Sequence, residues 1–96
     1  MIEKLNKVFE SRVRMGIMAI LAVNETISFH ELKERLDATD GNLSSHGSAL
    51  EKQNYIEIQK TFIGKKPHTL FKATKEGKKA FLDHINALEN MIKNIQ

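Results

Sequence analysis

The sequence predicts a mainly helical α+β fold in a single domain, in which a β-hairpin separates three shorter helices from a long C-terminal helix. Three observations lead to this prediction. Apolar residues recur at helical spacing in the first half of the chain, alternate between residues 55 and 73, and return to helical spacing after residue 74. With 96 residues, 41% of them hydrophobic, the chain can bury one core, and chains of this size often gain stability by oligomerising.

The first helical segment is "IEKLNKVFESRVRMGIMAILAV", residues 2–23. Its apolar residues repeat every three or four positions, which is typical of one buried helix face. The pattern is interrupted around Glu10 and Ser11, so it allows a break in the helix there. Asn24 and Glu25 end the segment.

The second and third helices each begin with a clear start signal. Ser28 and Glu31 have the spacing of a capping box, which satisfies free backbone N–H groups at a helix start. Thr39 can cap the third helix, with Asp40 in its first turn, and this helix is expected to run to about Gln53. Two short helices joined by a turn of two or three residues predict a helix-turn-helix unit.

A change of period marks the β-hairpin. The stretches "YIEIQKTF" and "HTLFKA" alternate between apolar and polar residues, and "IGKKP" connects them. Gly64 and Pro67 interrupt regular structure in that connection. The tip of the hairpin is therefore expected to consist of "GKKP" and to carry Lys65 and Lys66.

The last helix begins after Thr74 and carries an apolar seam in steps of four and three. The seam consists of Phe81, Ile85, Leu88, Ile92 and Ile95. Such a seam is typical of helix pairing, and it is too long to be used fully within so small a domain. It predicts a two-fold dimer, to which Ile2, Leu5 and Phe9 could contribute. The alternative is that the terminal helices pack on each other within one chain.

This order of elements is the winged-helix layout, and three stretches resemble winged-helix transcriptional regulators of the MarR and ArsR groups. The stretches are "SRVRMGIMAIL", "DGNLSSHGSALEKQNYIEI" and "GKKPHTLFKATKEGKKAF", and the similarity covers about residues 8–83. The resemblance implies a homodimeric, cytoplasmic, DNA-binding regulator. Residues 11–73 would form the DNA-binding core, with the wing at 55–73, and residues 1–10 and 74–96 would form dimerisation helices.

The sequence departs from these regulators in the third helix. Position 47 is glycine where they have leucine, and Asn54 stands where glycine is usual. Gly47 falls between Leu43 and Leu50 on the side that must pack on the earlier helices. Either another side chain fills the space, for which Phe29, Met18 or a C-terminal side chain are candidates, or the helix bends there.

Positive charge is concentrated in one fifth of the chain. Residues 60–79 hold seven lysines and one glutamate, a local net charge of +6, whereas the remainder carries −3. Such a distribution is expected of a surface that binds a polyanion, although a solvated lysine-rich loop has the same composition. Arg12 and Arg14 could add contacts or form surface ion pairs instead.

The DNA-binding residues are predicted on the third helix and the wing. The helix offers small polar side chains, which allow close approach to the major groove but include no arginine for a bidentate contact to guanine. The wing offers positive charge for phosphates. The predicted residues are Asn42, Ser44, Ser45, His46, Ser48, Lys60, Lys65, Lys66 and His68. The alternative for the helix is a polar face that only meets solvent.

The sequence does not support catalysis, and it predicts neither a metal nor a cofactor. Ser45 and His46 are adjacent on one helix, so their side chains diverge by about 100° and cannot form a nucleophile–base pair. The chain has no cysteine, and the last helix offers only Asp83, His84 and Glu89 as metal ligands. No apolar run is long enough to span a membrane, and no signal peptide is present, so a cytoplasmic location is expected.

The predicted function is therefore that of a homodimeric, sequence-specific regulator that binds double-stranded DNA as a repressor and occludes its site. Two alternatives stay open. The charge-poor third helix would also suit a winged-helix protein-interaction module that does not bind DNA. A small-molecule effector could bind between the DNA-binding core and the dimer helices, although no cluster of polar residues identifies one.

Overall fold

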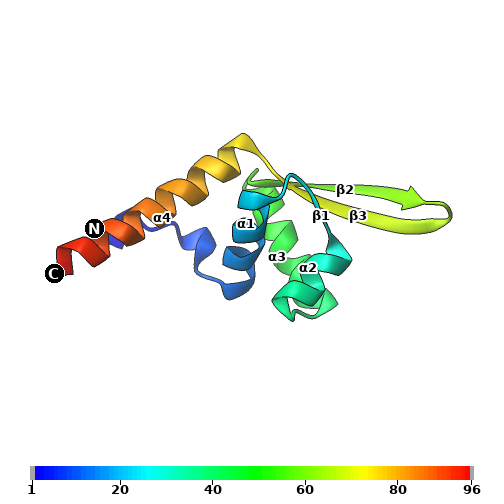
Figure 1. The fold of residues 1–96 in the computed structure, drawn as a ribbon, viewed down its shortest axis with the longest axis horizontal. Coiled ribbons are helices and arrows are strands. Elements are labelled where there is room, and N and C mark those ends of the chain that lie inside the picture. The colour runs from blue at the N-terminus through cyan, green and yellow to red at the C-terminus, as the bar shows by residue number, and fades with distance from the viewer. Residues whose placement is uncertain (1, 96) are drawn as a thin grey trace.

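The computed structural model describes residues 2–95, and its elements follow the predicted order. Three α-helices form the centre of the molecule, and the β-hairpin and the last helix project from this centre in opposite directions (Figure 1). The molecule is consequently elongated, with extents of 55 × 25 × 21 Å. Its α-helices are α1 (Arg12–Val23), α2 (Phe29–Leu36), α3 (Asp40–Lys52) and α4 (Lys75–Ile95), and its strands are β1 (Ile27–Ser28), β2 (Ile56–Ile63) and β3 (Lys66–Ala73).

Residues 2–10 do not form an α-helix, which corrects the prediction of a helix there. They contain two short 3-10 turns, η1 (Ile2–Lys4) and η2 (Lys7–Phe9). The interruption expected at Glu10 and Ser11 is present, because the Ser11 side chain caps α1 by accepting a hydrogen bond from the Arg14 backbone N–H at 3.3 Å. A residue that caps a helix has non-helical backbone geometry itself, as Ser11 does with a φ of −135° and a ψ of 132°, so the helix must begin anew here.

The helix-turn-helix unit forms as predicted. Ser28 Oγ accepts a hydrogen bond from the Glu31 N–H, and Thr39 Oγ1 accepts one from the Asn42 N–H, each at 3.1 Å. Three residues separate α2 from α3, the first of which, Asp37, has a left-handed backbone with a φ of 50°. These local bonds set the two helix starts.

The sheet has the strand order β1-β3-β2, and all its pairs are antiparallel. The hairpin turn is tighter than expected, because Ile63 pairs with Lys66 and only Gly64 and Lys65 lie in the turn. Gly64 has a φ of 63°, a conformation that tight two-residue hairpin turns require. Lys66 and Pro67 therefore belong to β3 and not to the tip.

A single aliphatic core fills the space between the helices and the sheet, with Phe71 of β3 in its middle. Phe71 takes the space beside Gly47: a Cβ placed on that glycine would lie 2.8 Å from Phe71 Cζ. The prediction that a side chain compensates for the glycine is correct, but the suggested candidates were wrong. α3 continues through this position without interruption. The core consists of Phe9, Ile17, Met18, Leu21, Ile27, Leu32, Leu43, Leu50, Ile56, Phe71 and Ala73.

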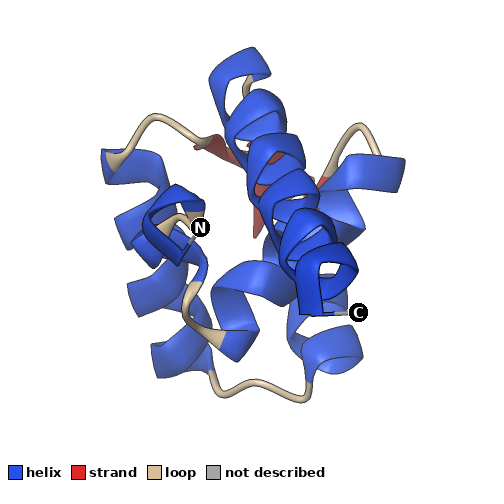
Figure 2. Cartoon of the chain, turned by 90° about the vertical axis from the view of Figure 1, so that its left-hand side faces the viewer, coloured by secondary structure: helices blue, strands red, loops and turns tan. Residues whose placement is uncertain are grey.

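The N-terminal segment packs on α4 of the same chain (Figure 2). The Asn6 backbone N–H donates to Nδ1 of the buried His84 at 2.9 Å. Phe9 is buried, with its ring 5.5 Å from those of Tyr55 and Phe81 and 5.2 Å from that of His84. The expected contribution of Phe9 to a dimer contact is therefore wrong, since its ring is already enclosed within its own subunit.

The predicted α4 seam is only partly covered. Phe81, Ile85 and Leu88 are half-buried, whereas Ile92 is 61% exposed, and Leu82, ten residues earlier on the same helix, is 60% exposed. The Ile95 side chain lies outside the described residues. The start of α4 is anchored by Thr74, whose hydroxyl donates to the Asn54 carbonyl at 2.7 Å.

Candidate nucleic-acid interface

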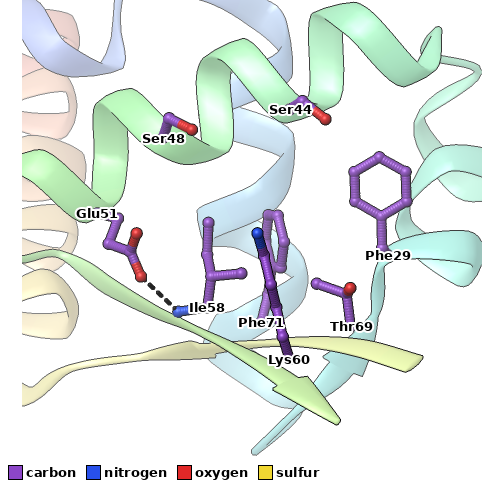
Figure 3. A pocket seen from close by; sticks show the side chains of 8 residues that line it. All are labelled: Phe29, Ser44, Ser48, Glu51, Ile58, Lys60, Thr69 and Phe71. Carbon is purple, nitrogen blue, oxygen red and sulfur yellow. Dashed lines mark hydrogen bonds between the residues drawn. The ribbon is translucent and has the colours of Figure 1, made fainter. Parts of the chain in front are cut away.

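A groove of about 380 Å³ separates α3 from the β-hairpin (Figure 3). The side chains of Ser44 and Ser48 point from α3 towards the hairpin, and Lys60 extends from β2 towards the helix. The apolar residues Ile58 and Phe71 form part of the groove wall. The groove thus brings two of the predicted helix contacts, Ser44 and Ser48, and one predicted wing contact, Lys60, to the same surface.

The outer face of α3 is small, polar and exposed. Asn42, Ser44, Ser45 and Ser48 are all accessible to solvent, whereas Leu43, Gly47 and Leu50 are buried on the other side. This is the orientation that helical periodicity predicted. The carboxylate of Asp40, the residue with which α3 begins, is neutralised by Lys33 of α2 at 2.9 Å, so little negative charge opposes a phosphate there.

His46 lies at the margin of this face, not in its centre. It is half-buried, and its Nδ1 accepts a hydrogen bond from Arg14 Nε at 3.1 Å. The Arg14 guanidinium also donates to the Val8 carbonyl at 3.4 Å. Arg14 therefore links α1, α3 and the N-terminal segment through hydrogen bonds, and the DNA contact suggested for it stays a prediction.

The hairpin register divides the predicted wing residues between its two faces. Residues directly opposite each other in an antiparallel pair project on the same side, and the side alternates along the strand. Lys60 lies opposite Thr69, on the side of the groove, whereas His68 opposite Thr61 and Lys66 opposite Ile63 lie on the other side. Lys65 is in the turn.

The wing lysines are available to bind an external anion. Lys60, Lys65 and Lys66 are exposed, and within residues 2–95 none of their side chains forms a hydrogen bond or an ion pair. Lys79 of α4 differs from them, since it forms an ion pair with Asp83 at 2.8 Å. The hydrogen bond and the charge of Asp83 raise the pKa of Lys79.

Glu51 is a residue of this surface that the sequence analysis missed. Its Oε2 accepts a hydrogen bond from the Ile58 backbone N–H at 2.9 Å, so it ties the last turn of α3 to the base of the hairpin (Figure 3). It also places a negative charge in the groove that Lys60 lines. Only the tertiary structure brings these residues together, because a glutamate near a helix end has no distinctive sequence signal.

A second hollow lies beside the start of α3. Arg12, Arg35 and Asn42 line it together, so two guanidinium groups stand near one of the predicted DNA contacts. The sequence analysis did not single out Arg35. In the structure, its guanidinium pairs with the carboxylate of Glu31, one helical turn earlier, at 3.1 Å. An arginine whose partner is an exposed carboxylate can exchange it for a phosphate at modest cost.

The candidate metal ligands of α4 are used within the chain. Asp83 pairs with Lys79, and His84 holds the Asn6 backbone. Across the part of the chain that the structure describes, no three His, Cys, Asp or Glu side chains cluster closely enough to hold a metal ion. The same residues contain no helix with the length and apolar character needed to cross a membrane.

Solved structures with this fold include transcriptional regulators. A transcriptional regulator homologue from Pyrococcus horikoshii superposes with a TM-score of 0.82 at 27% identity, and the match covers 98% of each chain. YusO from Bacillus subtilis gives 0.79 at 18% identity, with 98% of this chain and 66% of YusO covered. NadR, solved in complex with 4-hydroxyphenylacetate, gives 0.71 at 20% identity, with 97% and 67% covered. The last two likenesses show the fold alone.

Sequence comparison agrees with the fold. An uncharacterized protein of Methanocaldococcus jannaschii is 39% identical over 90 residues, which are 94% of this chain and 98% of that protein. Residues 13–92 match the winged helix DNA-binding domain family. This match includes the helix-turn-helix unit, the hairpin and most of α4, and it confirms the predicted resemblance to winged-helix regulators. The chain therefore belongs to the winged helix DNA-binding domain family and has the fold of a transcriptional regulator.

Proposed function

We propose that this protein is a homodimeric transcriptional regulator that binds specific double-stranded DNA sequences. α3 would enter the major groove, and the wing lysines would contact the phosphate backbone. The observation that supports this most directly is the shared surface. The uncharged outer face of α3 and the hairpin side that carries Lys60 border one groove, with Lys65 free at the hairpin tip.

The contacts of α3 would depend on close approach. Asn42, Ser44, Ser45 and Ser48 have short side chains, so the helix backbone can lie deep in the major groove while amide and hydroxyl groups bond to base edges or phosphates. His46 would act at the edge of this contact. Because its Nδ1 accepts from Arg14, a neutral ring carries its proton on Nε2 and can donate to an acceptor.

The wing would supply most of the electrostatic affinity. Lys65 and Lys66 of two subunits would neutralise about four phosphates, which gives a log–log salt slope of roughly −3 to −4 from these residues alone. Lys60 would contribute from the groove, and His68 from the opposite side of the hairpin. Affinity would thus be strongly dependent on salt, while base discrimination would be modest.

Dimerisation would use the uncovered side of α4. Leu82 and Ile92 are more than half exposed, and the half-buried Ile85 and Leu88 lie between them along the helix. A two-fold contact through the seam of Phe81, Ile85, Leu88, Ile92 and Ile95 would present two α3 helices to successive major grooves. Bound in this way, the protein would repress transcription by covering its site.

A binding titration tests the proposal. The protein should shift random duplex DNA at about 50 mM salt, and selection from genomic fragments should enrich a two-fold symmetric sequence bound more tightly than random duplex. Sedimentation should show a dimer at micromolar concentration. A protein that ignores duplex DNA at low salt would instead be a protein-interaction module, and one that remains monomeric would contradict the dimer.

A second candidate, control by a small ligand, is favoured by one apolar hollow. A space of about 280 Å³ between α1 and α4 is lined by Met18, Phe81, Leu82 and Ile85, with Lys78 at its edge. One amine beside apolar walls suits a small aromatic carboxylate, and the similarly folded NadR was solved with 4-hydroxyphenylacetate. Calorimetry with 4-hydroxyphenylacetate should show binding that Lys78→Met abolishes, and absence of any heat would reject this ligand.

A further inference from the structure

The wing tip carries two large apolar side chains on a strongly basic hairpin. Phe62 is 68% exposed and Ile63 is 64% exposed, although both are residues that proteins usually bury. Phe62 lies directly opposite Pro67, so a ring and a pyrrolidine adjoin at the end of the hairpin. From residue 58 to residue 68 the hairpin holds three lysines and no acid.

The hairpin register places Phe62 on the side that faces the proposed DNA. The pairs Ile58–Phe71, Lys60–Thr69 and Phe62–Pro67 follow one another on one side of the hairpin. Residues of the first two pairs line the groove beneath α3, so Phe62 continues the same surface beyond it. Ile63 lies opposite Lys66 and projects from the other side.

The distance along the hairpin suits the neighbouring groove of a duplex. Four residues of strand separate Ile58 from Phe62, which corresponds to about 13 Å. Half a turn of B-DNA, the step from the major groove to the adjacent minor groove, is about 17 Å. With α3 in the major groove, the hairpin would therefore carry Phe62 most of this distance towards the next minor groove.

We propose that Phe62, supported by Pro67, is an apolar wedge that enters the minor groove and partly unstacks a base step. This inference depends on the proposed DNA binding and adds a bending role to a wing that otherwise supplies only charge. The lysines of the hairpin favour a polyanion as the ligand. The apolar side chains of Phe62 and Pro67 favour a ligand that also offers an apolar contact, which the base edges and sugars of DNA provide. Wedges of this kind bend DNA by about 20–90° towards the major groove.

Single-tryptophan variants test the wedge, because the chain contains no Trp. Phe62→Trp and Ile63→Trp place one indole on each side of the hairpin, at positions of nearly equal exposure. On saturation with duplex DNA, the indole at position 62 should lose at least about half of its emission, because bases stack on aromatic rings. The indole at position 63, the matched control, should change little. Equal quenching at the two positions would overturn the wedge.

An alanine variant supplies the second measurement. Phe62→Ala should lower DNA affinity about tenfold. It should also reduce the DNA bend, which is measured by energy transfer between dyes at the two ends of one duplex. The salt slope should stay unchanged, because no phosphate contact is lost. A wild-type protein that fails to bind duplex DNA would refute the proposed function itself. If the wild-type protein binds DNA and Phe62→Ala changes only self-association, the tip of the hairpin is a protein contact. That result would overturn the wedge.

Discussion

The ring of Phe71 in β3 packs so closely on Gly47 of α3 that it fills the space a side chain would need there. A Cβ at position 47 would lie 2.8 Å from Phe71 Cζ and 2.9 Å from Cε2. α3 therefore lies directly against the aromatic ring of Phe71. Phe71 is fully buried and packs against Phe29 with a ring separation of 6.2 Å, so it cannot easily yield. The spacing of α3 from the hairpin, and with it the groove, depends on this pair.

We predict that Gly47→Ala destabilises the protein although alanine is the better helix former. Alanine gains about 1 kcal/mol in helix propensity, but forcing a methyl group against the ring costs about 1–3 kcal/mol. The free energy of unfolding in urea should fall by up to about 2 kcal/mol. Gly41→Ala is the control, since nothing lies within 4 Å of a Cβ there, and it should leave stability unchanged or raise it. A stabilised Gly47→Ala would show that the ring moves freely.

Replacing Glu51 by glutamine should strengthen DNA binding. The glutamine side-chain oxygen can still accept the Ile58 N–H, so the hairpin stays anchored while the groove loses a negative charge. We expect affinity at low salt to rise by about three- to tenfold, with less gain at high salt. Glu57→Gln, on the other side of the hairpin opposite Lys72, is the control and should change affinity less. Equal gains would mean that only net charge matters.

Lys65→Ala combined with Lys66→Ala should weaken binding to all duplexes alike. Phosphate contacts carry no sequence information, so specific and random DNA should lose similar affinity, and the salt slope should become shallower by roughly 3 to 4 for a dimer. Lys4→Ala with Lys7→Ala removes the same charge from the N-terminal segment and should leave the slope nearly unchanged. Undiminished affinity of the wing variant at low salt would contradict the proposed use of the wing.

Leu82→Glu combined with Ile92→Glu should dissociate the proposed dimer without unfolding the subunit. Both side chains are largely exposed, so the charges cost little in a monomer but repel across a two-fold contact. Sedimentation should give a monomer at micromolar concentration, and affinity for a two-fold site should fall by about a hundredfold, since two linked half-sites no longer bind together. Val23→Glu, at an apolar position 82% exposed on α1, should remain dimeric. A dimeric double variant would place the interface elsewhere.

The helix boundaries and the order of elements could be predicted because they depend on contacts between near neighbours. Ser28 and Thr39 each accept a hydrogen bond from the residue three positions later, so the caps are visible in the sequence itself. Alternation over residues 55–73 likewise revealed the hairpin. The length of its turn was missed because "GKKP" is compatible with either a two- or a four-residue connection, and cross-strand pairing decides between them.

The parts that escaped prediction are contacts between different secondary-structure elements. Phe71 fills the space beside Gly47, Arg14 binds His46, and Glu51 holds Ile58, and none of these pairs has a periodic or local signature. The outward face of α3 was correctly foreseen from helical geometry, but the position of His46 at its margin was not. The DNA contacts themselves stay predictions.

By itself, the sequence determined which segments become helices and strands and which α3 side chains face outwards, because capping and periodicity act within a few residues. Only the tertiary structure decided how α3 is spaced from the wing and which hairpin side continues its surface. It also decided that Phe9 is enclosed by its own subunit. Packing depends on how the shapes of side chains fit together across the core. Helix or strand propensity and the spacing of apolar residues along the chain contain no information about that fit.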